Sequence, residues 1–308
     1  MDYQLVSHQV FKFCVMKKIS FKIIIVVLTI AFFIKCDFVH NANPVLEPSA
    51  TINLDTTKVY RKILIEDYTG HKCGNCPRAA DTLNYLHHKY GDKIVSLAVH
   101  AGGFATVNPN YPTDLRSTSG NDYDNAFGFA TAGNPNGLVN REGYLPTDAI
   151  DFIKAYPVWE STALTYFPKL ADFKIEIKNT FNTNNNVLNT DVTIKALSNL
   201  NGNYKLVILL SEDSIIGEQL DYEKPVGSQK ITDYVFNHVL RGAINSTWGD
   251  DVFTTEVVKN NSVSKSYSYV LNTSYKSNHC HVIAYIYDAD LNSPTYYEVL
   301  QVEEKQLN

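Results

Sequence analysis

The sequence has few cysteines, no surplus of positive charge and no apolar run long enough for a membrane span. Its five cysteines among 308 residues are too few for a small scaffold held together by disulfides. With 27 Lys and Arg against 32 Asp and Glu, the formal net charge is -5, which argues against a nucleic-acid-binding protein. The hydrophobic fraction of 44% is too high for an intrinsically disordered chain. The sequence also lacks a phosphate-binding glycine loop and a hydrolytic triad. The length of 308 residues and the hydrophobic fraction are those of a globular protein of one or two domains.

The first 36 residues have the pattern of an export signal. Lys17 and Lys18 precede an uncharged apolar run over residues 23–34, shorter than the roughly 20 residues that a membrane-spanning helix needs. A basic segment followed by a short apolar run is typical of a secretory signal, and a buried or anchoring helix is the alternative. Met16 is a plausible start of translation, with residues 1–15 as an upstream extension. We therefore expect an extracytoplasmic protein, in a compartment where disulfides persist.

Cys36 directly follows the apolar run, where a lipoprotein signal places its acylated cysteine. A polar tether over residues 37–58 comes next, so we expect Cys36 to be lipidated and the protein to be held on a membrane by this anchor. Lys35 differs from the small residues that usually precede such a cysteine. An ordinary cleaved signal, with Cys36 removed or unmodified, is the alternative.

Residues 59–170 alternate between strand and helix patterns. The segments 61–68 and 93–100 are apolar and strand-like, and the segment 73–90 between them has apolar residues at helical spacing. This order predicts two parallel strands with a right-handed helical crossover. We expect four further elements in this part, namely a loop, a short helix, a strand and a mostly helical segment (102–120, 123–129, 137–141 and 148–167).

Residues 171–308 contain seven strand-like runs separated by turn residues, with no long helix between them. This pattern predicts an antiparallel sandwich of immunoglobulin-like type. The runs are 173–181, 187–197, 204–212, 232–240, 264–271, 281–288 and 296–304. The overall expectation is an α/β domain followed by a β domain.

The motif Cys73-Gly-Asn-Cys76 is the feature that can carry chemistry, because it opens a predicted helix directly after a buried strand. The N-terminus of a helix favours an anion, so we expect the pKa of the Cys73 thiol to be lowered. Cys76 could then attack a mixed disulfide formed at Cys73, which gives a nucleophile and a resolving thiol. Pro77 is compatible with the first helical turn.

Other interpretations of the cysteine pair differ in what they require. A c-type haem site needs a histidine at position 77, which is Pro77. A zinc site needs two more ligands, for which His71 and the distant run His279-Cys280-His281 are at hand. Zinc binding through Cys73 and Cys76 is thus a third alternative, and we expect no metal and no cofactor. A structural disulfide that stays closed in an oxidising compartment is the main alternative.

The order of strand, Cys-x-x-Cys, helix and strand resembles the thioredoxin fold. The resemblance implies that Asp67, six residues before Cys73, is the buried acid that assists proton transfer to the resolving thiol. It also implies that Pro135 is the cis-proline facing the cysteine pair, here preceded by Asn134. A surface or capping acid and an ordinary trans loop proline are the alternatives for these two residues.

Four stretches together resemble the 28-kilodalton outer-membrane lipoprotein family of Bacteroides-type bacteria. They are IEDYTGHKCGNCPRAA, SLAVHAGGF, NPNGLVNREGY and YVFNHVLRGAINSTWGD. The resemblance implies a thioredoxin-like domain followed by a β-sandwich domain, lipid-anchored at the outer membrane. Roles as a surface adhesin or receptor have been proposed for members of this family.

Several residues outside the motif could tune the site or are explained by packing. His100 ends the second predicted strand near Cys73, and it could tune thiolate formation or simply bond to the loop. His71 could raise the local positive potential, or it could be a solvated loop residue. Cys280 alternates with apolar residues on a strand and is expected to be buried, with His279 and His281 on the opposite face. The segment 237–248 is expected to pack within the protein.

Two hypotheses follow for the function. In the first, the protein is a thiol–disulfide oxidoreductase that acts on a protein disulfide through Cys73 and Cys76, with Asp67 and Pro135 assisting. In the second, it is a non-enzymatic surface protein in which the Cys73–Cys76 disulfide is structural and the β domain binds a surface ligand.

Overall fold

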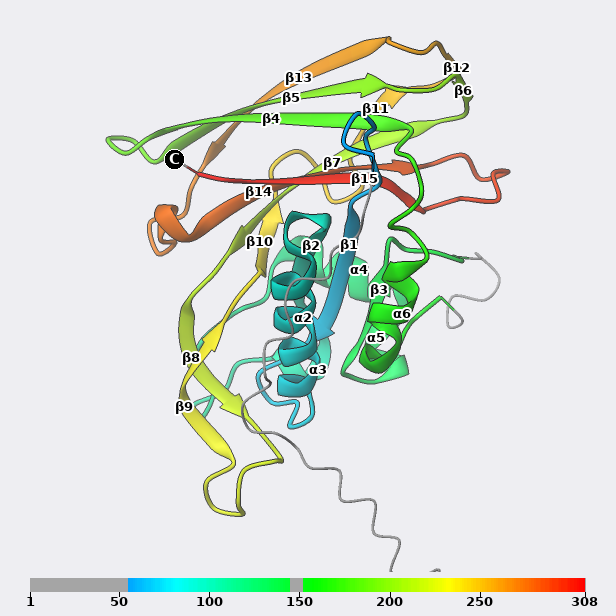
Figure 1. The fold of residues 1–308 in the computed structure, drawn as a ribbon. Helices are drawn as coiled ribbons and strands as arrows, with labels where there is room; N and C mark the ends of the chain where they lie inside the picture. The colour runs from blue at the N-terminus through cyan, green and yellow to red at the C-terminus, as the bar shows by residue number, and fades with distance from the viewer. Residues whose placement is uncertain (1–54, 145–151, 308) are drawn as a thin grey trace, which may run out of the picture. The chain divides into compact units, whose positions relative to one another are not determined.

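A mixed sheet of eight strands runs through residues 55–144 and 152–307, the part of the chain that the structure describes (Figure 1). The structure is a computed structural model. The strands of this sheet lie in the order β15 (Val299–Gln306), β14 (Cys280–Asp288), β7 (Tyr204–Glu212), β10 (Val239–Ala243), β2 (Ile94–His100), β1 (Ile63–Thr69) and β3 (Asn136–Val139), and β11 (Asp250–Phe253) pairs with β7. The fold is mixed α/β with strands predominating, as the sequence predicted in outline. The expected signal segment, Cys36 and the tether up to residue 54 lie outside the described residues.

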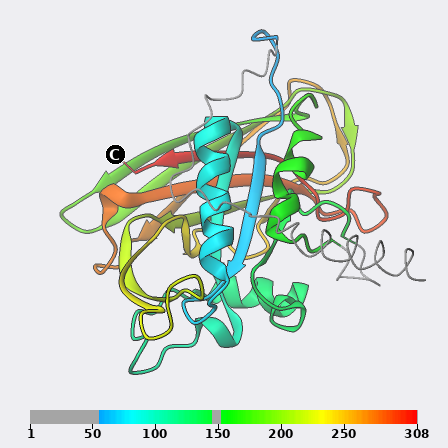
Figure 2. The ribbon, with the colours of Figure 1, turned by 60° about the horizontal axis from the view of Figure 1, so that its bottom comes forward.

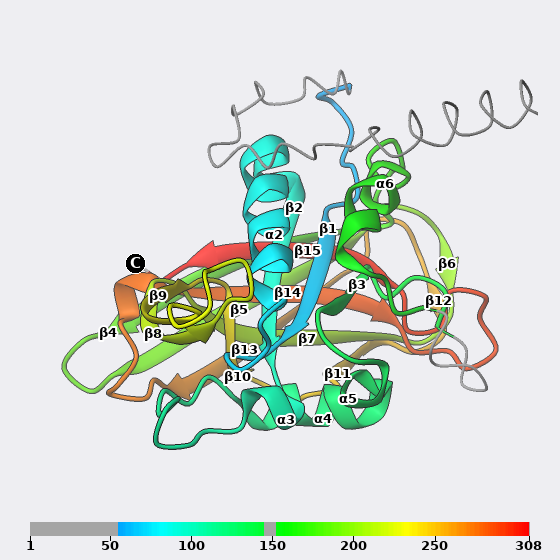
Figure 3. The same cartoon turned by 90° about the horizontal axis from the view of Figure 1, so that it is seen from below.

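The predicted strand–helix–strand unit is confirmed. Strands β1 (Ile63–Thr69) and β2 (Ile94–His100) pair in parallel, and α2 (Cys76–Tyr90) connects them. Strand β3 (Asn136–Val139) pairs with β1 in the antiparallel direction. Figure 3 shows α2 and α6 (Trp159–Leu164) on one side of these strands and α3 (Gly102–Ala105), α4 (Thr118–Phe127) and α5 (Phe129–Ala132) on the other. Because both faces are covered, β1 and β2 are buried along their whole length.

Helix α2 begins three residues later than predicted. The cysteine motif starts in a turn in which the Cys73 N–H donates to the Gly70 carbonyl at 2.9 Å. The helix then starts at Cys76, with Pro77 in its first turn. Proline has no N–H, and the first turn is the one place in a helix where that donor has no intrahelical partner to lose.

The other helices of this part are short. Their bounds are α3 (Gly102–Ala105), α4 (Thr118–Phe127), α5 (Phe129–Ala132) and α6 (Trp159–Leu164). The long helix predicted over 148–167 is wrong for the described residues, which contain a 3-10 turn (Tyr156–Val158) and α6 there. Pro157 explains the difference, because a proline fits the first turn of a helix and interrupts a helix that would run through it.

The C-terminal part consists of strands, as predicted. Their bounds are β4 (Phe173–Asn182), β5 (Val187–Ala196), β6 (Leu200–Asn201), β7 (Tyr204–Glu212), β8 (Ile215–Leu220), β9 (Lys230–Phe236), β10 (Val239–Ala243), β11 (Asp250–Phe253), β12 (Glu256–Val257), β13 (Ser262–Val270), β14 (Cys280–Asp288) and β15 (Val299–Gln306). Strands β13-β5-β4 form a second sheet, and β8 pairs with β9 as a separate hairpin. The single strand predicted over 232–240 is wrong. It divides into β9 and β10 because His238 adopts a φ of 59°.

Two apolar cores lie on the two faces of the C-terminal strands. Successive residues of a strand point to opposite faces, so Leu206 and Ile208 of β7 face the β13-β5-β4 sheet while Val207 joins the other core. That other core also contains Leu64 of β1 and Leu97 of β2. One core therefore extends across the sheet from the N-terminal strands to the C-terminal ones.

Strand β10 joins the N-terminal and C-terminal strands of the main sheet. It pairs with β2 in parallel at Val239 and Ala98, and with β7 in the antiparallel direction. The Ala98 N–H also donates to the His238 carbonyl at 2.7 Å. The expected packing of residues 237–248 is thus confirmed. The sheet continues across the predicted domain boundary at residue 170, and Glu47–Asn308 form one compact unit.

Candidate functional site

The two cysteines of the motif form a disulfide where β1 leads into α2, beside the hairpin β8–β9 (Figure 2). Their Cα atoms are 5.4 Å apart. Cys73 is 3% exposed and Cys76 is 2% exposed, so the folded chain covers both residues. The site lies at the carboxyl ends of the parallel strands β1 and β2, the end at which open α/β sheets bind ligands.

Asp67 is buried within β1, at 1% exposure. Among the described residues, its Oδ1 atom has no hydrogen-bond partner. Burial penalises the charged carboxylate and raises the pKa of Asp67 from an ordinary 3.8 to about 8. The side chain is therefore mostly protonated at neutral pH, which excludes the alternative of a surface or capping acid.

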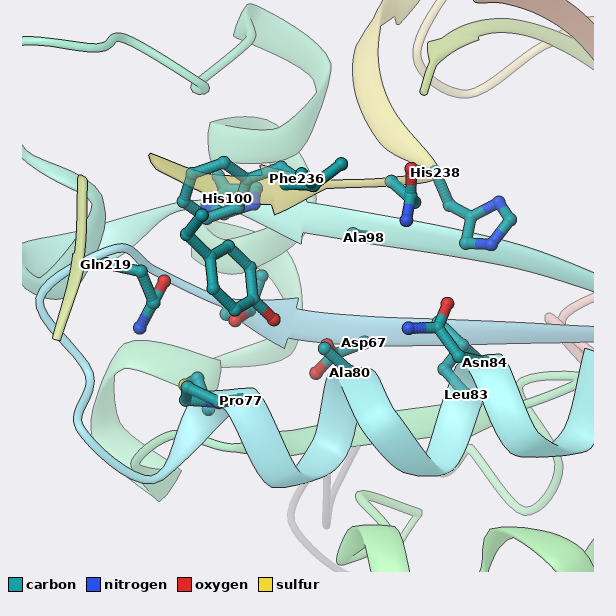
Figure 4. Close-up of a pocket in the computed structure, with 15 residues that line it drawn as sticks. Asp67, Pro77, Ala80, Leu83, Asn84, Ala98, His100, Gln219, Phe236 and His238 are labelled. Atoms are coloured by element: carbon teal, nitrogen blue, oxygen red, sulfur yellow. The ribbon is translucent and has the colours of Figure 1, made fainter. Parts of the chain in front are cut away.

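Asp67 and Cys76 line the same small cavity, between α2, β1, β2 and the end of β9 (Figure 4). The cavity has a volume of about 30 Å³, enough for a water molecule or two. Gln219, Phe236 and His100 close it from the other side. A buried acid that lines the same cavity as a disulfide sulfur can give its proton to the thiolate that forms there when the disulfide breaks.

His100 also lines this cavity and is 3% exposed. Burial, followed by the nearby charges of His71 and Arg241, lowers the pKa of His100 to about 3, so the imidazole is neutral at physiological pH. The ring packs edge-on against Phe236, with the centroids 5.4 Å apart. His100 therefore lies close enough to influence the site, as an uncharged group.

His71 is buried at 1% exposure, so the expectation of a solvated loop residue is wrong. Its ring stacks on Tyr111, and its Nε2 lies 3.2 Å from the Thr106 carbonyl oxygen. Burial lowers the pKa of His71, which leaves the ring uncharged at neutral pH. The expected increase in positive potential is therefore wrong as well.

The Asn134–Pro135 peptide bond is cis, the conformation that the thioredoxin resemblance implied. Asn134 lines a second hollow of about 410 Å³, next to the cysteine motif. Lys72, Phe104 and the Gly102–Gly103 turn form other parts of its wall. The hollow is large enough to receive a side chain of a second molecule.

Sequence reasoning missed the contribution of the hairpin β8–β9 to the site. Gln219 is buried, and its amide nitrogen donates to the Cys73 carbonyl at 3.0 Å. Residues 215–220 read Ile-Ile-Gly-Glu-Gln-Leu, which do not alternate between apolar and polar residues, so the sequence carried no clear strand signal for β8. Its contact with the cysteine motif spans 146 residues of sequence, and no local pattern encodes a contact of that range.

Cys280 is a free, fully buried cysteine, as predicted. Burial raises the pKa of its thiol to about 12. His279 does not share a strand face with His281, because it lies in a 3-10 turn (Ser277–His279) that precedes β14. Within residues 55–144 and 152–307, no group of three or more His, Cys, Asp or Glu side chains is arranged to hold a metal ion.

Comparison with known families identifies the C-terminal three fifths of the chain. The family described as outer membrane protein Omp28 matches residues 120–308. The chain belongs to the Omp28 family. The resemblance seen in the sequence is thereby confirmed, as is the expected location at the outer membrane. The match begins after the cysteine motif, so the chemistry at Cys73 and Cys76 has to be argued from geometry.

Solved structures are similar to this Omp28 chain at low sequence identity. HBP35 of Porphyromonas gingivalis shares the fold with a TM-score of 0.56 at 15% identity, over 81% of this chain and 76% of that chain. A domain of the outer membrane lipoprotein Omp28 from Porphyromonas gingivalis is 21% identical over 45% of this chain and 89% of that chain, with a TM-score of 0.31. No curated protein matches the chain. The helices of the described residues are all too short or too polar to cross a membrane.

Proposed function

We propose that this Omp28-family protein exchanges disulfides with client proteins at the outer membrane through Cys73 and Cys76. The observation that carries the proposal is the shared cavity of Cys76 and Asp67, a buried acid that is protonated at neutral pH. A disulfide that only stabilises the fold has no use for an acid beside it, since burying that acid costs stability. Such an arrangement is common where a proton must move during the reaction.

We further infer that β1, α2, β2 and β3 form a thioredoxin-like unit. The parallel pair β1–β2, the antiparallel β3 and the cis peptide bond at Pro135 support this assignment. The β13-β5-β4 sheet packed on the β7 and β14 strands supports an immunoglobulin-like sandwich in the C-terminal part. In this arrangement Pro135 and the adjoining hollow shape the surface on which a client docks.

The exchange begins from the disulfide state of the protein. A client thiolate bonds to Sγ of Cys73, the Cys73–Cys76 bond breaks, and Cys76 leaves with the electron pair. The neutral Asp67 gives its proton to the Cys76 thiolate through the shared cavity. A second client thiolate then attacks the client sulfur of the mixed disulfide and releases Cys73 as a thiolate, and water supplies one proton to Cys73 and one that restores Asp67. The client dithiol is oxidised to a disulfide and the Cys73–Cys76 pair is reduced to a dithiol. The same steps in reverse reduce a client disulfide.

The lipid anchor at Cys36 remains part of the proposal. The position of Cys36 directly after an apolar run supports it, and the outer-membrane family agrees with it. Metabolic labelling with a fatty acid tests the anchor. We expect label on the natural chain and none on a Cys36→Ser variant, and an unlabelled natural chain would contradict the proposal.

A second candidate function is supported by the low exposure of the cysteines. Residues that are 3% and 2% exposed are poorly placed for a client, and a buried disulfide often serves stability alone. In this alternative the protein is a surface adhesin or receptor whose β-sandwich binds the ligand.

The reduction potential of the Cys73–Cys76 pair decides between the two candidates. For an exchange protein we expect a potential between roughly -120 and -270 mV and a lowered pKa of the Cys73 thiol. Equilibration with glutathione, followed by mass spectrometry of the peptide containing both cysteines, excludes the other thiols from the measurement. A potential below about -300 mV with an unreactive Cys73 would assign the pair a structural role.

A further inference from the structure

The hairpin β8–β9 is hydrogen-bonded directly to the turn that carries the cysteines. Three donors from the hairpin reach three carbonyls of this turn: Leu220 N–H to His71 at 2.8 Å, the Gln219 amide to Cys73 at 3.0 Å and Tyr222 N–H to Gly74 at 2.9 Å. Figure 2 shows the hairpin alongside the N-terminal end of α2. The turn is therefore bonded to a hairpin that lies 146 residues further along the chain.

The Tyr222 ring lies directly on Gly74, between the two cysteines. A Cβ atom at position 74 would come within 2.5 Å of the ring carbons. Only glycine permits this approach, so residue 74 allows the hairpin to sit against the backbone of the motif. The ring itself is 56% exposed, which shows that it forms an outer cover over the turn.

Arg78 fastens the end of the hairpin to α2. Its guanidinium contacts Asp221 at 3.4 Å and Glu223 at 2.7 Å, and it also donates to the Gly74 carbonyl at 3.0 Å. Glu223 is 45% exposed, and ion pairs with a partner at this exposure are individually weak. These ion pairs therefore hold the hairpin against α2 but can break.

On its other edge the hairpin rests on the loop before α4. Thr113 donates to Glu218 at 3.2 Å, and the ammonium group of Lys230 lies 5.3 Å from the centre of the Tyr111 ring. Helix α2 and the loop before α4 thus both contact the same hairpin. Because both cysteines are almost fully buried, an attacking thiol needs this cover to move before it can align with the disulfide.

We propose that the hairpin β8–β9 is a gate over Cys73–Cys76, and that Tyr222 and the Arg78 ion pairs determine which thiols reach the disulfide. The inference rests on the exchange function proposed above, to which it adds a basis for client selection. A small dithiol needs only a slight opening, whereas a folded client needs the hairpin displaced. The preferred client is therefore an extended segment that can take over the hydrogen bonds of the hairpin to His71 and Gly74.

The test measures how fast dithiothreitol reduces Cys73–Cys76 in the purified full chain. The variants are Tyr222→Ala, which removes the ring, and Asp221→Asn with Glu223→Gln, which removes the ion pairs and keeps side-chain size. Val226→Ala is the matched control, because Val226 lies in the same hairpin loop and is 93% exposed. The peptide holding both cysteines is alkylated and quantified by mass spectrometry, so that Cys280 does not contribute.

We expect both gate variants to react at least tenfold faster than the natural chain, and the control to match the natural chain. The equilibrium constant with dithiothreitol should change by less than twofold, because a gate affects both directions equally. Unchanged rates in the two variants would overturn the proposal. A shift of the equilibrium constant equal to the rate change would also overturn it, since the hairpin would then stabilise one redox state. If Tyr222→Ala does not fold, the double amide variant decides the question.

The same variants separate the gate from the exchange function. Faster reduction by dithiothreitol, with no transfer to an unfolded protein dithiol by any variant, supports the gate and refutes the exchange function. Transfer to the protein dithiol by the natural chain, at a rate that the gate variants do not raise, refutes the gate and supports the exchange function.

Discussion

The protonated state of Asp67 makes a prediction about stability that does not depend on any client. In the unfolded chain an aspartate ionises near pH 3.8, whereas in the folded chain burial raises its pKa to about 8. Between these values the folded state holds a proton that the unfolded state has lost, so stability falls as pH rises. Asp67→Asn removes the titration and keeps the shape of the side chain. The variant should therefore be more stable than the natural protein at neutral pH.

The size of the effect follows from the two pKa values. Each tenfold change in proton affinity corresponds to about 1.4 kcal/mol, so the difference amounts to roughly 4 kcal/mol at pH 7. The buried amide of the variant also lacks a good partner, which offsets roughly 1 kcal/mol or more. A net gain of about 2–3 kcal/mol corresponds to a rise in melting temperature of roughly 5–10 °C for a protein of this size.

The assay is thermal unfolding of the oxidised natural protein and the variant at intervals from pH 4 to pH 9. The difference in melting temperature should be near zero at pH 4, grow through neutral pH and level off above pH 8. Asp233→Asn is the control, because Asp233 is exposed on β9, and it should show no such trend. A difference that is the same at pH 4 and pH 8, or a variant that is less stable throughout, would refute the assignment of Asp67 as a buried, protonated acid.

Two further predictions concern the resolving thiol and a buried ion pair. Cys76→Ser should trap a mixed disulfide between Cys73 and an unfolded client, because the resolving thiol is gone, and a non-reducing gel would show it. A Cys73→Ser variant should trap none. Equal trapping by both variants would count against the assigned roles. Glu66→Gln should lower the free energy of unfolding by about 3–5 kcal/mol in urea titrations, because it leaves the guanidinium of Arg141, bonded to Glu66 at 2.7 Å and 0% exposed, without its counter-charge. Adding Arg141→Met should recover much of this loss, and a double variant as unstable as the single one would contradict the explanation.

The strand–helix–strand unit and the cysteine motif could be predicted from the sequence. Residues 63–65 and 94–99 are rich in Ile, Leu and Val, and buried parallel strands have that composition. The helix after Cys76 has apolar residues at helical spacing, and Gly91 ends it. The cis bond at Pro135 agreed with a resemblance carried by a few residues around it. In each case the signal lies within a short stretch of chain.

The predicted and observed bounds differ by a few residues at the start of α2 and at His238, where one predicted strand divides into β9 and β10. Both differences have local causes. Pro77 fixes the first turn of the helix, and a left-handed φ at His238 interrupts an otherwise regular strand. Both features depend on backbone conformation at a single residue, which the pattern of apolar residues does not report. The neutral states of His71 and His100 have a different origin. They depend on burial by segments that are distant in sequence.

The sequence by itself determined the strand–helix–strand unit and the residues that could carry thiol chemistry, because apolar spacing, proline and the Cys-x-x-Cys motif act over a few residues. Only the tertiary structure decided the surroundings of those residues. The burial that keeps Asp67 protonated comes from α2, β2 and β9, and the cover over Cys73 comes from a hairpin about 150 residues away along the chain. Both are properties of contacts between distant segments, and a desolvation energy or a steric cover exists only once those segments have packed.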